Sequence, residues 1–287
     1  MLLATAIWAT TFVLVQRALA VMPLFHLMAY RFVLAVLLLL PLARGVRWTR
    51  ALVVDGLGIG LALFCGFVLQ GAGLLWTTPS RAAFLTCLSV VLVPLIGLAL
   101  GRRLARGPAI GTLLAAAGLW VLYRPAAGLD LRFNRGDAME IAGAFAFAVF
   151  ILLIERAAPL HPLPALAVLE FGLVAVLSLP SLVLQPPVLR EVTGFGLFAI
   201  LAMGIFATAL AFVLQLYAQR HLSAIEAGVI FTLEPVLAAL FSIGLGVEPW
   251  SLALAGSGAL IVAAMLVTEL WGGPGDVPPA VAAAPRG

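Results

Sequence analysis

The sequence predicts an all-α integral membrane protein with ten transmembrane helices, arranged as two inverted repeats of five helices. Three observations support this prediction: the composition, apolar runs of bilayer-spanning length, and an internal repeat. Of the 287 residues, 64% are hydrophobic and 10% are charged, whereas globular domains are roughly half apolar and about a quarter charged. Helices satisfy every backbone polar group within one segment, as lipid requires.

Ten apolar segments, most of them close to the roughly 20 residues that cross a bilayer, follow one another with short loops between them. The first lacks the basic region that opens a secretory signal peptide, so we interpret it as a membrane helix. Residues 272–287 are rich in Gly, Pro and Ala and are predicted to form a disordered cytoplasmic tail. The expected helices are residues 2–20, 24–42, 52–76, 81–100, 108–124, 137–157, 163–185, 194–219, 224–245 and 251–271.

Arginine-rich loops predict the orientation. Three arginines follow the second segment and three follow the fourth, whereas the loops on the other side of the first half contain only Arg17 and Arg81. Because such loops stay cytoplasmic, we expect a multi-pass protein of the cell (inner) membrane with both termini cytoplasmic. The bias is weaker in the second half. The six arginines are Arg44, Arg47, Arg50, Arg102, Arg103 and Arg106.

The chain repeats itself with one change of offset. A shift of 139 residues aligns the first two segments with the sixth and seventh, and a shift of 145 aligns the next three with the last three. The two copies span residues 1–124 and 137–271. An odd number of helices per copy inverts the second copy, as in many secondary transporters, whose substrate site lies at the repeat interface. Matched pairs include Arg17 with Arg156, Pro41 with Pro180, Gln70 with Gln215, and Gly111 with Gly256.

The ninth segment contains Glu234, directly followed by Pro235, near its middle. Proline breaks a helix, and a carboxylate at bilayer depth is costly unless it faces protein or water. A broken helix with a charge is typical of a transport site. We therefore expect Glu234 to bind a cationic part of the substrate or to titrate during transport. The alternative is a kinked packing helix whose acid has a neighbouring partner. The first copy has the uncharged Ser89 at the equivalent position.

Arg31 is the second charged candidate, about two turns inside its helix. It could bind a substrate carboxylate in bidentate fashion, or it could form a structural ion pair with Glu170 or Glu234. Glu140 and Glu226 lie near helix starts, where a carboxylate suits the helix dipole, so we interpret both as capping residues.

Uncharged candidates complete the predicted site. The amides of Gln70 and Gln215 could bind substrate or another helix. Thr86 and Ser89, three residues apart, share a helix face, although such hydroxyls often bond their own backbone. Aromatic side chains could line the cavity or simply pack; they are Trp8, Phe12, Phe147 and Tyr217.

Other classes of function are less well supported. The chain lacks the H-E-x-x-H and G-x-S-x-G motifs and any Cys/His ligand spacing, so we expect no catalytic residue, metal or cofactor. The histidines His26, His161 and His221 lie at helix ends. An intramembrane enzyme and a channel remain the alternatives, but a channel would normally show polar rings along its pore. The small, scattered net charge of +4 does not indicate a nucleic-acid partner.

Six short motifs are distributed along nearly the whole chain: Ile7-Trp8-Ala9-Thr10-Thr11-Phe12, Tyr30-Arg31-Phe32, Arg81-Ala82-Ala83-Phe84-Leu85-Thr86, Val91-Leu92-Val93-Pro94-Leu95, Leu233-Glu234-Pro235-Val236 and Gly246-Val247-Glu248-Pro249. Together these motifs resemble the drug/metabolite transporter superfamily, in its EamA family. The resemblance implies ten helices and a central cavity lined mainly by helices 1, 3, 4, 6, 8 and 9. It also implies transport, often outward, of amino acids, sugars, nucleobases, drugs or other metabolites. One departure is Gly101-Arg102-Arg103, where the family often has Gly-Glu.

Together these features predict a secondary transporter, and more narrowly an exporter, that works by alternating access through a central cavity. The predicted partners are a small-molecule substrate and the lipid bilayer. The chain shows no ATP-binding loop, so transport is expected to run on gradients; a proton is one candidate for the coupling ion, whose identity the sequence leaves open. A mostly apolar cavity with few charges suits an amino acid or a drug-like amphipathic compound.

Overall fold

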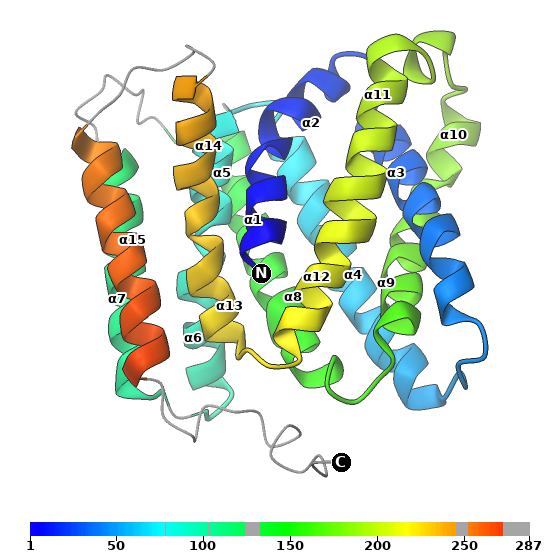
Figure 1. The fold of residues 1–287 in the computed structure, drawn as a ribbon. Helices are drawn as coiled ribbons and strands as arrows, with labels where there is room; N and C mark the ends of the chain where they lie inside the picture. The colour runs from blue at the N-terminus through cyan, green and yellow to red at the C-terminus, as the bar shows by residue number, and fades with distance from the viewer. Residues whose placement is uncertain (78, 103, 124–132, 245–251, 272–287) are drawn as a thin grey trace.

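The computed structural model describes residues 1–77, 79–102, 104–123, 133–244 and 252–271, and these residues form helices with no strand among them (Figure 1). The predicted disordered tail, residues 272–287, lies outside the described residues. In chain order the elements are α1 (Leu2–Ala9), α2 (Thr11–Leu19), α3 (Leu24–Leu39), η1 (Leu40–Ala43), α4 (Arg50–Gly73), α5 (Pro79–Thr86), α6 (Ser89–Ala99), α7 (Arg106–Tyr123), α8 (Arg135–Ala157), α9 (Leu163–Ser178), α10 (Pro180–Leu184), η3 (Leu189–Glu191), α11 (Gly194–Ala202), the π-helical η4 (Met203–Leu210), α12 (Ala211–Gln219), α13 (Ala224–Phe231), α14 (Leu233–Gly244) and α15 (Leu252–Trp271).

Seven helical segments among the described residues are long and apolar enough to cross a membrane. They coincide with the first four expected ranges and with the sixth, seventh and eighth. The other three expected ranges fold as α7, as α13 with α14, and as α15, which contains the shorter apolar stretch Ala255–Thr268. The seven segments are Leu2–Leu19, Leu24–Ala43, Arg50–Gly73, Ala82–Ala99, Arg135–Ala157, Leu163–Leu184 and Gly194–Gln219.

The fourth and ninth expected helices are both interrupted near their middles. The ninth breaks at Thr232, between α13 and α14. Pro235 explains this break, because it has no N–H and its ring clashes with the carbonyl four residues earlier, that of Phe231. In this structure the Phe231 carbonyl accepts a contact of 3.9 Å from the Cys87 thiol instead. Cys87 itself lies at the break between α5 and α6.

Helix boundaries follow the offsets of the sequence repeat. Both ends of α3 and α9 differ by 139 residues, and each of these helices starts directly after a proline, Pro23 or Pro162. Both ends of α5 and α13 differ by 145 residues. Equivalent residues therefore begin and end equivalent helices, even where the two copies share few identical side chains.

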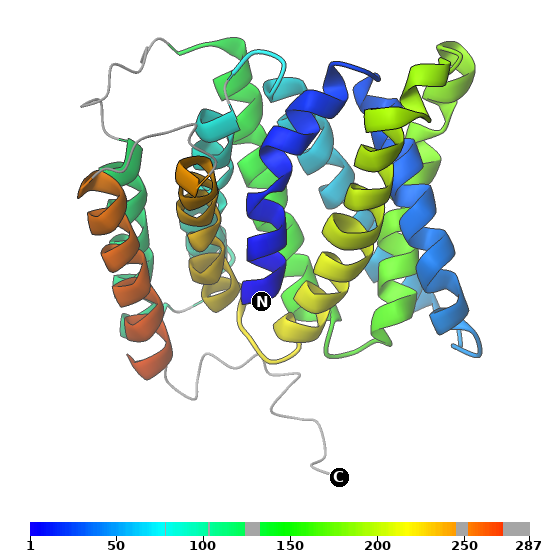
Figure 2. The ribbon, with the colours of Figure 1, turned by 45° about the horizontal axis from the view of Figure 1, so that its top comes forward.

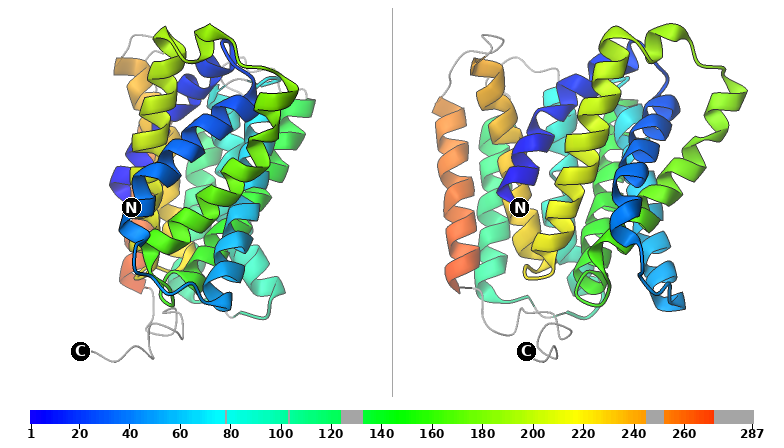
Figure 3. Two further views of the ribbon diagram at one scale, coloured as in Figure 1. Left: turned by 90° about the vertical axis from the view of Figure 1, so that its right-hand side faces the viewer. Right: turned by 45° about the vertical axis from the view of Figure 1, so that its right-hand side comes forward.

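The helices pack as one bundle with a pair at either edge. At one edge α7 and α15 lie along each other (Figure 2), and at the other α3 lies beside α9 (Figure 3). Between them, α4 packs against α8 and α9. Small residues allow this close approach: a Cβ added at Gly60 would lie 2.9 Å from the Cα of Glu170. The completely buried Phe32 and Phe171 fill the adjoining core.

Candidate functional site

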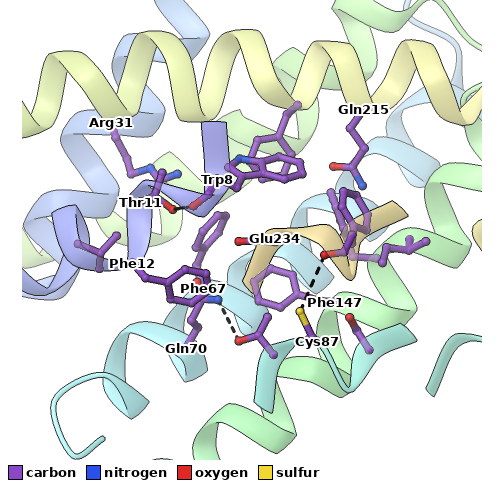
Figure 4. A pocket seen from close by; sticks show the side chains of 17 residues that line it. Trp8, Thr11, Phe12, Arg31, Phe67, Gln70, Cys87, Phe147, Gln215 and Glu234 are labelled. Atoms are coloured by element: carbon purple, nitrogen blue, oxygen red, sulfur yellow. Dashed lines mark hydrogen bonds between the residues drawn. The ribbon is translucent and has the colours of Figure 1, made fainter. Parts of the chain in front are cut away.

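A cavity of about 90 Å³ lies within the bundle (Figure 4). Its walls come from expected helices 1, 3, 4, 6, 8 and 9, with Arg31 added from α3. Tyr217 is the candidate that lies elsewhere: its side chain is 60% exposed on α12 and its ring is 5.7 Å from that of His221. Nine of the ten candidate site residues from the sequence line the cavity, namely Trp8, Phe12, Arg31, Gln70, Thr86, Ser89, Phe147, Gln215 and Glu234.

Aromatic rings form much of the wall. The ring of Phe212 lies 4.8 Å from that of Trp8 and 6.0 Å from that of Phe67, and Phe67 meets Phe147 at 5.6 Å with their planes nearly perpendicular. Such edge-to-face pairs are favoured by the charge distribution of the rings, so the rings hold one another in place. Sequence reasoning had included Trp8 and Phe147 but missed Phe67 and Phe212, although these two are equivalent residues of the repeat.

Arg31 is buried at the cavity with an exposed fraction of 4%. Its Nε donates a hydrogen bond of 3.0 Å to Thr208 Oγ1, and its guanidinium carbon lies 4.7 Å from the ring centroid of Phe67. No ion pair within the described part of the chain includes Arg31. The structural pair with Glu170 or Glu234 that the sequence left open is therefore not formed here, and the guanidinium retains donors for an anionic group.

Glu234 is the second residue of α14 and is half-buried at the cavity wall. Figure 4 shows its carboxylate among the aromatic side chains of the lining. None of the hydrogen bonds or ion pairs between described residues involves this carboxylate. The Glu234 carboxylate therefore faces the cavity. The alternative, in which a residue of a neighbouring helix pairs with this acid, is not observed among the described residues.

Gln70, Thr86 and Glu140 form a hydrogen-bonded chain that leads away from the cavity. Gln70 Nε2 donates to Thr86 Oγ1 at 3.2 Å, and Thr86 Oγ1 donates to Glu140 Oε2 at 3.0 Å. The capping interpretation of Glu140 was wrong, because the α8 N-terminus is capped by Asn134 and Asp137 while Glu140 lies in the second turn. The sequence alone did not indicate this contact of Glu140 with Thr86.

The other residues named from the sequence are Glu226, Gln215, Ser89 and Glu170, and each has different contacts. Glu226 is a capping residue, as predicted, because its Oε2 accepts a hydrogen bond of 2.6 Å from the backbone N–H of Ser223. Gln215 Nε2 donates to Gln219 Oε1 at 2.8 Å, so the amide nitrogen of Gln215 forms a hydrogen bond to the next turn of α12. Ser89 is 5% exposed at the start of α6. Glu170 is completely buried, and neither of its carboxylate oxygens has a hydrogen-bond partner in the described structure.

Pairs of acidic and basic residues connect helices near the ends of the bundle. His26 Nδ1 lies 2.7 Å from Glu191 Oε2, and His161 Nε2 lies 2.9 Å from Asp55 Oδ2. Glu155 pairs with Arg102 and accepts a hydrogen bond of 2.8 Å from the backbone N–H of Ala224 at the start of α13. These contacts join helices of the two halves away from the cavity. The histidines are thus placed at helix ends, as predicted.

Comparison with known proteins gives one consistent result. The model of the EamA-like transporter family matches residues 1–124 and 134–269, which confirms the resemblance found in the sequence. A relative from Archaeoglobus fulgidus, described as an uncharacterized transporter, is 32% identical over 86% of this chain and 77% of its own length. A second uncharacterized transporter, from Clostridium kluyveri, is 23% identical over 84% and 83%. A solved crystal structure with 27% identity superposes with a TM-score of 0.75, covering 93% of this chain and 94% of its own.

Proposed function

Because the chain belongs to the EamA-like transporter family, we propose that this membrane transporter is a secondary exporter of small amphipathic metabolites of the hydrophobic amino-acid class. Substrate would occupy the aromatic cavity and reach either side of the membrane by alternating access. Transport would use gradients, with a proton as the coupling ion.

The observation that supports this substrate class best is the pair Arg31 and Glu234. Two side chains of opposite charge line one cavity, and neither forms an ion pair with the other or with any other described residue. A zwitterion satisfies both: its carboxylate would bind the guanidinium, and its ammonium group would bind the acid. The rings of Phe67, Phe147 and Phe212 would contact an apolar side chain.

The equal offsets of helix boundaries support a second part of the proposal, namely ten membrane-crossing helices in two inverted five-helix repeats. Packing agrees with this arrangement, since the equivalent helices α3 and α9 contact each other, as do α7 and α15. Inverted repeats around a midplane site allow one half to rock against the other. The cavity, lined by equivalent residues such as Gln70 and Gln215, lies at that interface.

The positions of the arginine-rich turns support cytoplasmic termini. In Figure 1 the turn between η1 and α4 and the turn after α6 lie at the lower end of the bundle, which is also the end at which α15 finishes. We assign this end to the cytoplasm, by the tendency of such loops to remain inside.

Purified protein in proteoliposomes tests the substrate class. Labelled L-phenylalanine should enter with saturation kinetics and should be displaced by unlabelled L-phenylalanine or L-leucine. Phenethylamine lacks the carboxylate and 3-phenylpropionate lacks the ammonium group, so each should compete at least about tenfold less well, given about 1.5–3 kcal/mol for a charged hydrogen bond. Equal competition by all four compounds would exclude a zwitterion site, and flux that does not saturate would indicate a channel.

A further inference from the structure

We propose that Glu140 is a proton-binding residue of this transporter, and that it exchanges its proton with the cavity through the hydroxyl of Thr86. This inference builds on the transport function proposed above and adds a second acid, beside Glu234, to its mechanism.

The burial of Glu140 is the first reason. The side chain has no exposed surface, and its Oε1 has no hydrogen-bond partner among the described residues. Buried polar atoms without partners are uncommon and require an explanation. The site is also tightly enclosed: a Cβ added at Gly73 of α4 would lie 2.6 Å from Glu140 Oε1. A metal ion would need several oxygen ligands and space for them, whereas a proton needs only the carboxylate.

The connection to the cavity is the second reason. Thr86 lines the cavity and also donates its hydroxyl hydrogen to Glu140 Oε2. A hydroxyl both donates and accepts, so it can pass on a proton. As Thr86 gives its hydrogen to the carboxylate, its oxygen receives one from a donor in the cavity, and charge and atoms balance. Gln70, which donates to the same oxygen at 3.2 Å, holds the hydroxyl in position. Chains of this kind serve as proton relays in pumps and transporters.

The charges around Glu140 do not provide it with an ion pair. On α8 the nearest acid is Asp137, one turn closer to the N-terminus, where it belongs to the helix cap. Helices α4 and α5 contribute the uncharged side chains of Gln70 and Thr86 to the hydrogen bonds that lead to Glu140. Across the cavity lie Glu234 and Arg31. At the far ends of α8 and α6, Glu155 is paired with Arg102.

The contact of Thr86 with Glu140 joins the two copies of the repeat, and the repeat does not duplicate it. The residue equivalent to Thr86 is Phe231, which has no hydroxyl, and the position equivalent to Glu140 is Met1. Because the proton-binding Glu140 has no equivalent acid in the other half, the two inverted halves would differ in function, as expected of a transporter that couples two gradients.

Infrared difference spectroscopy on the reconstituted protein tests proton binding without any substrate. Wild type should show a carboxylic C=O band that disappears as the pH is raised, and Glu140→Gln should lack that band. Thr86→Val, which retains the acid, should keep the band but shift it to higher frequency, since the carboxyl loses a hydrogen bond. Glu226→Gln is the matched control, because Gln also forms a capping box, and it should match wild type. A Glu140→Gln spectrum identical to wild type, or an unshifted band in Thr86→Val, would overturn the proposal.

Transport measurements test coupling. In proteoliposomes an imposed pH gradient should drive accumulation of labelled L-phenylalanine by wild type and by Glu226→Gln. Glu140→Gln should still exchange internal for external phenylalanine but should lose accumulation. If wild type does not move phenylalanine, the substrate class fails while the infrared result for Glu140 still stands. A Glu140→Gln protein that accumulates phenylalanine like wild type, or a wild type driven by a sodium gradient in place of the pH gradient, would contradict the role of Glu140.

Discussion

The indole Nε1 of Trp8 donates a hydrogen bond of 2.8 Å to the carbonyl oxygen of Ala207, inside the π-helical segment η4. A π turn takes carbonyls out of the regular α-helical pattern and is frequent at functional sites. In the same segment Thr208 donates to the carbonyl of Met203, five residues earlier, and accepts from Arg31. The irregular turn therefore fixes both an aromatic wall and the cationic group of the cavity.

Trp8→Phe should destabilise the protein and weaken substrate binding. The ring is largely kept, but the Ala207 carbonyl loses its donor, and an unsatisfied buried acceptor costs about 1–3 kcal/mol. Thermal unfolding in detergent measures the loss. Trp120→Phe is the control, since Trp120 is 64% exposed on α7 and should leave the melting temperature unchanged. An identical melting temperature for both variants would show that the Trp8 bond contributes no stability.

Arg31→Gln should lower the affinity for a zwitterionic amino acid by about 10- to 100-fold, as expected for the loss of a charged hydrogen bond of about 1.5–3 kcal/mol. The same change should leave competition by phenethylamine, which has no carboxylate, nearly unaffected. The measurement is competition against labelled L-phenylalanine in proteoliposomes, with the exposed Arg17 replaced by Gln as a control. Equal losses for the zwitterion and the amine would assign Arg31 a purely structural role.

Gly60→Ala and Gly58→Ala form a matched pair on α4. A Cβ at Gly60 would lie 2.8 Å from the backbone oxygen of Glu170, whereas one at Gly58 would meet nothing within 4 Å. Overpacking against backbone costs about 1–3 kcal/mol, so Gly60→Ala should lower the melting temperature and the folded yield. Gly58→Ala should be neutral or stabilising, because Ala favours helices by about 0.5–1 kcal/mol. Equal melting temperatures would contradict the close crossing of α4 and α9.

Reporter fusions test the orientation. Fusions after Gly45 and after Gly101, which lie in the arginine-rich turns that follow η1 and α6, should report a cytoplasmic location. A fusion after Thr77, between α4 and α5, should report the opposite side. A C-terminal fusion located outside the cytoplasm would end the ten-helix topology.

Patterns that depend on neighbouring residues in the chain were predictable. Apolar runs gave the helical ranges, Pro235 gave the break before α14, and the repeat placed Glu234, Ser89 and both glutamines at one site. The prediction that Tyr217 belongs to this set was wrong, and helix geometry explains why. Tyr217 lies two residues after Gln215, and residues two apart do not face the same side of a helix. Gln215 lines the cavity, so Tyr217 faces outward.

Features that depend on tertiary contacts were not predictable. Nothing in the run Met203–Leu210 distinguishes a π turn from an α-helix, because the turn is stabilised by Trp8 and Arg31 from other helices. The role of Glu140 likewise depends on Thr86, 54 residues away, and on the missing side chain of Gly73. Short-range helix-dipole reasoning therefore assigned Glu140 to capping.

Exchange of labelled L-phenylalanine by Glu234→Gln protein tests most directly the claim that the cavity is the transport site. Gln keeps the size of the side chain but cannot titrate or bind an ammonium group as an anion, and Glu226→Gln controls for removing one charge. Glu234→Gln protein should elute from size exclusion like wild type and insert normally, yet lose pH-dependent exchange. Exchange at the wild-type rate with the wild-type pH profile would contradict this claim and would make Glu234 a structural residue.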